Sequence, residues 1–243
     1  HALATMRASN AHTLAALTAA SMAAAACIAI DDQRDELLRA LRLVAPQQRL
    51  AFRQQVKAEL EAQLKAVPDE LGVILSSEHF HLSLQRPEEI ETLKQLLLEL
   101  GLEVQQVVIY LREPLALIES LFSTMVRSGD QRPLPADPAD PFVALICDHS
   151  ASLRRWRAVF GEAVLQPRAF PPQAGGSLSA DFLQLLGNAP AAGWPPEPQR
   201  QRNRGLNPSA LNLLAWLNRH CAWLTPQARH RWQRGLRRLL DGA

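Results

Sequence analysis

The sequence predicts an α/β fold of three layers, in which helices cover both faces of a central parallel sheet. Short apolar runs typical of buried strands alternate along the chain with segments whose apolar residues recur at helical spacing. The 29 residues between Ser77 and Val107 contain one helical pattern, a length that suits a right-handed crossover between parallel strands. Because 47% of the residues are hydrophobic, a core is readily formed, and we expect a single domain over 1–243.

Residues 1–70 are expected to form a helical N-terminal part of this domain. The alanine-rich stretch 10–30 predicts a core helix, since it is too short and too weakly hydrophobic for a membrane span. A signal peptide is the alternative, but polar residues interrupt the apolar run. Residues 31–67 predict two charged helices, broken near Pro46.

Residues 71–190 are expected to form the sheet core. A buried strand is predicted over Val73–Ser77, directly after Gly72. The next segment, Pro87–Leu100, has proline at its start and Gly101 past its end, which predicts a helix. Val107–Leu111 is the following strand.

The later elements carry weaker signals. Residues 128–141 hold four prolines and predict a loop, and the apolar run 142–147 is compatible with either a strand or a buried helix. Residues 164–170 predict a strand, and Pro167 favours either a sheet edge or the end of a strand. Further helices are predicted over 150–160, over 177–186 and from Asn207 onward. Residues 191–243 are expected to form a basic, helical C-terminal part.

Charge and cysteine content limit the function classes. The net charge is +2, but nine arginines and a single acid follow Pro198. We interpret Arg229 to Arg238 as a solvated helical face and expect no nucleic-acid partner. A nucleic-acid binder that uses the arginine-rich tail is the alternative. The three cysteines are widely spaced and odd in number, which favours a reducing, cytoplasmic compartment. His79 and His81 lie two apart on a segment predicted to be extended, but no third ligand has matching spacing, so no metal is expected.

Polar residues follow the two best-predicted strands. Ser77 and Glu78 come at the end of the first strand, and Arg112 ends the second. Since parallel strands share a carboxyl edge, where ligands bind, these groups should open into one crevice. Pro114 then opens a helix that carries Ser120, so an arginine and a serine eight residues apart can grip one phosphate, aided by backbone N–H groups at the helix start. An ordinary ion pair of Arg112 with a nearby glutamate is the alternative.

The stretch "VVIYLREPLALIESLFSTMVRSG" resembles the 3′-phosphate-binding element of sulfotransferases that use 3′-phosphoadenosine-5′-phosphosulfate (PAPS). The order of elements from Val73 to about Asn218 is similar to a bacterial sulfotransferase family associated with polysaccharide sulfation. Further matching stretches are "VILSSEHFH", "PEEIETLKQLL", "LRRWRAVFG", "SLSADFLQLLG" and "RNRGLNPSALNLL".

This resemblance implies a P-loop-like fold and a nucleotide site. Arg112 and Ser120 would hold the 3′-phosphate, with Ser123, Arg127 and Arg204 as further nucleotide contacts. A solvated helix face is the alternative for Ser123 and Arg127.

The resemblance also implies a reaction. Glu78, or else His79, would be the general base that deprotonates a glycan or polysaccharide hydroxyl for attack on the sulfonyl group of PAPS. The co-substrate would be PAPS, and no metal would take part.

One part of the family pattern is absent from the sequence. Such enzymes begin with a strand and a glycine-rich loop whose lysine grips the 5′-phosphosulfate. Here the first glycine is Gly72, and the three lysines, Lys57, Lys65 and Lys94, lie outside any glycine-rich turn. We expect this strand and loop to lie upstream of His1. Their natural loss is the alternative, and the chain would then be an inactive nucleotide-binding or protein-interaction module.

Overall fold

The computed structural model describes most of the chain between residues 43 and 185, together with three shorter parts. The described residues are 2–7, 14–16, 43, 45–66, 72–77, 79–127, 129, 140–172, 178–185 and 208–220. The strands are β1 (Ala2–Arg7), β2 (Leu14–Ala16), β3 (Gly72–Ser77), β4 (Val104–Arg112) and β5 (Leu165–Phe170). The helices are α3 (Pro46–Lys65), α4 (His79–Leu82), α5 (Pro87–Glu99), α6 (Pro114–Arg127), α7 (Pro141–Cys147), α8 (His149–Phe160), α9 (Leu178–Leu185) and α10 (Pro208–His220).

The chain divides into two compact units, each built from two separate stretches. Unit 1 comprises His1–Leu111 and Asp148–Ala192, and unit 2 comprises Arg112–Cys147 and Gly193–Ala243. Each unit has an apolar core of its own.

Unit 1 is built on a five-stranded sheet in the order β2-β3-β1-β4-β5. β2 runs parallel to β3, whereas β1 is antiparallel to both of its neighbours, β3 and β4. Ala2 lies opposite Ser77 on one side and Ile109 on the other, so β3 and β4 run in the same direction and end at one edge. The expected parallel sheet is therefore a mixed one, because β1 enters between two strands that run the opposite way.

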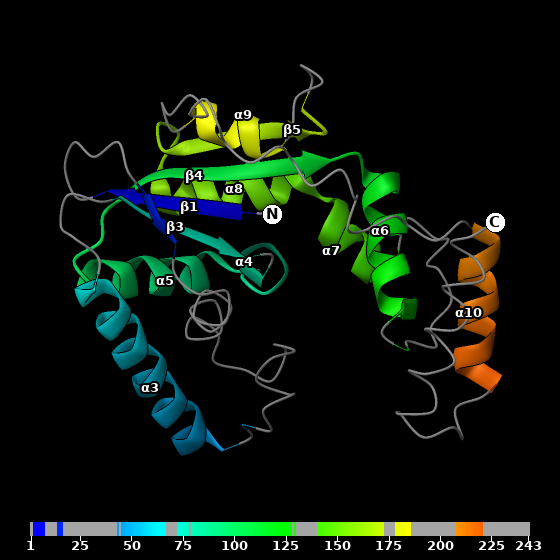
Figure 1. Cartoon of the computed structure of the whole chain (residues 1–243), viewed down its shortest axis with the longest axis horizontal. Helices are drawn as coiled ribbons and strands as arrows, with labels where there is room; N and C mark the ends of the chain where they lie inside the picture. Colours follow the sequence, from blue (N-terminus) through cyan, green and yellow to red (C-terminus); the bar gives the residue numbers. More distant parts are fainter. Residues whose placement is uncertain are drawn as a thin grey trace. The chain divides into compact units, whose positions relative to one another are not determined.

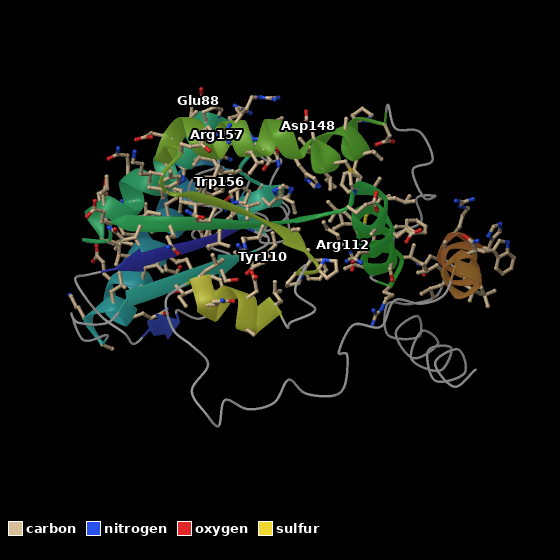
Figure 2. The ribbon with its side chains drawn as sticks, turned by 90° about the horizontal axis from the view of Figure 1, so that it is seen from above. Glu88, Tyr110, Arg112, Asp148, Trp156 and Arg157 are labelled. Atoms are coloured by element: carbon tan, nitrogen blue, oxygen red, sulfur yellow. The ribbon has the colours of Figure 1, made fainter. Side chains whose placement is uncertain are left out.

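Helices cover both faces of this sheet, which confirms the α/β class (Figure 1). Val107 and Ile109 of β4 belong to a core that includes Trp156 of α8 and many leucines of α5. Successive residues of a strand point to opposite faces, and the hydroxyl of Tyr110 bonds to α9. The strands consequently lie between α8 and α9 (Figure 2).

The helices α5 and α8 begin and end where the local signals predict. Glu89 of α5 accepts hydrogen bonds from the backbone N–H groups of Gln85 and Arg86, at 2.7 and 2.9 Å. Asp148 accepts a 2.8 Å bond from the N–H of Ala151 at the start of α8. Gly101 and Gly161, with φ of 73° and 83°, follow the two helices in the left-handed region that glycine adopts easily.

Two local predictions are wrong, and the structure decides a third segment that the sequence left ambiguous. Leu14–Ala16 forms the strand β2, so the prediction of a helix is wrong there, because pairing with β3 overrides the helix propensity of alanine. α4 is a short helix, so the expected extended segment from His79 to His81 is also wrong. The ambiguous apolar run after Pro141 is helical and forms α7.

Unit 2 has a small core between α6 and α10. Its buried residues are Phe122 and Val126 of α6 with Leu214 and Ala215 of α10. The buried amide of Asn218 donates a 2.7 Å hydrogen bond to the carbonyl of Val126 in the last turn of α6. Within the described residues, the helices are all too short or too polar to cross a membrane.

Candidate functional site

The carboxyl edge of the sheet in unit 1 brings together α4 and the first turns of α8. α4 follows β3 closely, after Glu78. After α8 ends, the chain enters β5 beside the first half of β4. There the Val107 N–H donates a 2.9 Å hydrogen bond to the carbonyl of Val164. The start of α8 therefore lies toward the opposite edge, where β3 and β4 end. Asp148 marks this start in Figure 2.

Four side chains connect α4 to α8 at this edge, and we call them the α4–α8 cluster: His81, Gln85, Ser152 and Arg155. His81 Nδ1 lies 3.2 Å from the hydroxyl oxygen of Ser152. The Gln85 amide donates to the carbonyl of His81 at 2.8 Å and accepts from Nη2 of Arg155 at 3.1 Å. The contacts of Ser152 with His81 and of Arg155 with Gln85 join α8 to α4 and to the segment that follows α4.

The guanidinium of Arg155 carries the charge of the cluster. Burial lowers its pKa, an effect that the nearby carboxylates of Asp148 and Glu89 oppose. Both carboxylates accept backbone N–H bonds at helix starts. Within the described part of the chain, the buried Nε of Arg155 has no hydrogen-bond acceptor.

The predicted phosphate element has the expected local structure. Arg112 is the last residue of β4, Pro114 is the first residue of α6, and Ser120 lies half-buried in the second turn. Glu113, however, accepts hydrogen bonds from the N–H groups of Leu115 and Ala116, at 3.0 and 2.8 Å. Both bonds lower the pKa of the Glu113 carboxyl, and the bond from Ala116 has the larger effect. The backbone donors expected to bind phosphate are thus already occupied.

The remaining predicted residues are distributed as follows. Ser123 is buried, so the alternative of a solvated side chain is wrong for it, because α10 packs on the neighbouring Phe122. Arg127 is half-buried at the end of α6. His79 begins α4, while Glu78 and Arg204 lie outside the described residues.

No group of three potential metal ligands occurs among the described residues.

A second polar network, which the sequence did not reveal, lies on the α9 face of the sheet. The Tyr110 hydroxyl donates to Oδ2 of Asp181 at 2.7 Å, and Arg168 donates to both carboxylate oxygens, at 2.6 and 3.4 Å. Arg168 lowers the pKa of Asp181, while burial and then the bond to Asp181 raise the pKa of Tyr110. At neutral pH the network is a phenol bound to a carboxylate, which suits fixing α9 rather than proton transfer.

The α4–α8 cluster was also missed, because its contacts join residues about 70 positions apart. One signal was available. Ser152 precedes Trp156 by one helical turn, so a hydroxyl falls on the buried face of α8.

No protein-family model, no curated protein and no solved structure matches this chain.

Proposed function

We propose that the chain is a sulfotransferase that moves a sulfonyl group from PAPS to a hydroxyl of a glycan or polysaccharide. The observation that carries this proposal is the junction of β4 and α6. A buried strand ends on Arg112, a proline opens the next helix, and Ser120 follows within it. In this proposal Arg112 and Ser120 bind the 3′-phosphate of the nucleotide.

The proposed fold is the P-loop-like version of the α/β class. Its support is the shared direction of β3 and β4 on either side of β1, which brings the ends of two strands to one edge. In open α/β sheets, ligands bind outside such ends. The proposed compartment is the cytoplasm, for which the cysteine pattern is the support.

The proposed reaction is an in-line displacement at sulfur. Glu78, next in the chain after the last residue of β3, takes the proton of the acceptor hydroxyl, or His79 does so. The acceptor oxygen bonds to sulfur as the bond from sulfur to the bridging phosphate oxygen breaks. Adenosine 3′,5′-bisphosphate then leaves with the electron pair of that bond.

The nucleotide site is tested by titration calorimetry with adenosine 3′,5′-bisphosphate and with adenosine 5′-phosphate. The parent chain should prefer the bisphosphate. Arg112→Ala should remove this preference and weaken bisphosphate binding by roughly 1.5–3 kcal/mol, the value of a hydrogen bond to a charged group. Equal bisphosphate affinity in parent and variant would contradict the assignment of Arg112.

Glu113→Gln provides a matched variant, which should change the bisphosphate affinity in the opposite direction to Arg112→Ala. The Glu113 carboxylate interacts electrostatically with Arg112 and occupies two backbone donors of α6. Removing its charge should strengthen bisphosphate binding, while the amide oxygen still accepts from the helix start. Weaker binding in this variant would indicate that phosphate does not approach α6 there.

The second candidate function is an inactive nucleotide-binding or protein-interaction module, and residues 1–243 contain no glycine-rich loop that carries a lysine. Losing one preorganised donor to the developing charge typically costs about 100- to 1,000-fold in rate. We therefore expect residues 1–243 to bind nucleotide with little transfer of radiolabelled sulfate to glycan. Robust transfer would exclude the module and would mean that another group holds the sulfonyl end.

A further inference from the structure

Arg155 is a half-buried cation whose hydrogen bonding is incomplete. Its hydrogen-bond partner in the described part of the chain is the neutral amide oxygen of Gln85. Its Nε is buried there without an acceptor. A buried N–H without an acceptor is costly, and arginines in such positions are commonly completed by an anion or by ordered water.

The surroundings of Arg155 supply further donors on the same side. Ser152 lies three residues earlier, on the same face of α8, and is 1% exposed. Its hydroxyl contacts the ring of His81, and Gln85 fixes both the His81 carbonyl and the guanidinium. The groups are thus held in position by contacts between α4 and α8.

We propose that Arg155, Ser152 and His81 form an oxyanion site at the carboxyl edge of the sheet, which takes a tetrahedral sulfonate or phosphate group. Nε and one terminal nitrogen of a guanidinium match two oxygens of such a group. The Ser152 hydroxyl and the imidazole supply the remaining polar contacts. This site goes beyond the proposed function and does not depend on nucleotide binding at Arg112.

The first test is sulfate binding by residues 1–243, measured by calorimetry at constant ionic strength set with chloride. Arg155→Gln should weaken sulfate binding by about tenfold or more. The matched control is Arg157→Gln, on the same helix, where the arginine is exposed and paired with Glu162. This control should bind sulfate like the parent.

Circular dichroism checks that each variant folds. If Arg155→Gln does not fold, Arg155→Lys keeps the charge but loses the planar fork and should weaken sulfate binding similarly. A parent chain that binds sulfate no better than chloride would overturn the proposal. So would equal losses in the variants of Arg155 and Arg157.

The second test identifies the source of the oxyanion. If PAPS is the source of the bound sulfonate, Arg155→Gln should weaken PAPS binding and leave adenosine 3′,5′-bisphosphate binding unchanged. If Arg155→Gln affects inorganic sulfate or phosphate alone, the ligand is the inorganic ion. Sulfate binding through Arg155 without any nucleotide binding would support this site and refute the proposed function.

Discussion

At the scale of single residues, the network of Tyr110, Asp181 and Arg168 shows how polar groups stabilise one face of the sheet. Asp181 is largely buried, and its two oxygens accept from a phenol and a guanidinium. Both carboxylate oxygens and the phenol have partners, so the network links β4, β5 and α9 without an uncompensated buried charge.

Asp181→Asn should lower the free energy of unfolding by about 1–2 kcal/mol, at the low end for charged hydrogen bonds because the Arg168 side chain is 40% exposed. The folded pKa of Asp181 lies below its ordinary 3.8, so this stabilisation is present above about pH 4 and is lost as the pH falls through the folded pKa. Urea unfolding at several pH values measures the difference, which should shrink in acid. A difference in unfolding free energy between parent and variant that does not change with pH would contradict the ion pair of Asp181 with Arg168.

Tyr110 is the single tyrosine of the chain, so phenolate absorbance reports on it alone. Because burial and the bond to Asp181 raise its pKa above 10.0, the folded chain should show no ionisation at pH 10. The stabilisation by the neutral phenol is present below pH 10 and is lost as the pH rises through the folded pKa. Asp181→Asn should shift the spectrophotometric titration to lower pH. An ordinary titration in a chain that circular dichroism shows to be folded would refute this.

Residue-level prediction from sequence succeeded where the signal was local. Arg112 and Pro114 were placed correctly at the end of a strand and the start of a helix, since both depend on neighbouring residues. Ser152 and Arg155 were missed because their partners, His81 and Gln85, lie about 70 residues earlier in the chain. The capping role of Glu113 was missed as well, although a carboxylate just before a helix is a familiar signal.

At the scale of elements, Asn218 joins α10 to α6 through a buried hydrogen bond. Asn218→Ala should lower the free energy of unfolding by about 1–3 kcal/mol, because the Val126 carbonyl loses a buried donor. Asn212, exposed on the same helix, is the matched control, and Asn212→Ala should change stability little. Chemical denaturation of both variants measures this. Equal effects would show that the bond is not a specific stabilising contact.

Three of the helices that begin with proline, α5, α6 and α10, were predicted, because a proline at the first position and an apolar stripe are readable within a dozen residues. β5 was likewise predicted, and it lies at the edge of the sheet, one of the two positions that Pro167 favours. β1 and β2 were not predicted as strands, because alanine-rich sequence favours helix and their pairing partners lie about 60 residues or more along the chain. The antiparallel direction of β1 has no local signal at all.

At the scale of the whole molecule, the two units have very different cores. The core of unit 1 contains fifteen buried residues in the described part of the chain, among them Leu60, Ile90 and Val107, which are entirely buried. The core of unit 2 contains four buried residues in the described part of the chain. Less buried apolar surface gives less stabilisation, so we expect unit 2 to unfold first.

Thermal unfolding of the full chain should therefore show two transitions. Val126→Ala should lower the first midpoint and leave the second nearly unchanged, while Leu93→Ala, in the core of unit 1, should lower the second. Differential scanning calorimetry separates the two. One transition that both variants lower equally would show that the units unfold as a single cooperative body.

The interleaving of the two units in the chain has a consequence for biosynthesis. The ribosome delivers β1 to β4 first, then the whole first stretch of unit 2, and only afterwards α8, β5 and α9. Until those arrive, the nascent sheet has an unprotected edge at β4, and Trp156 is missing from its core. α6 is likewise made long before α10, its packing partner. Unit 1 is therefore completed only after the first stretch of unit 2 has been made, and unit 2 is completed only after all of unit 1 has been made.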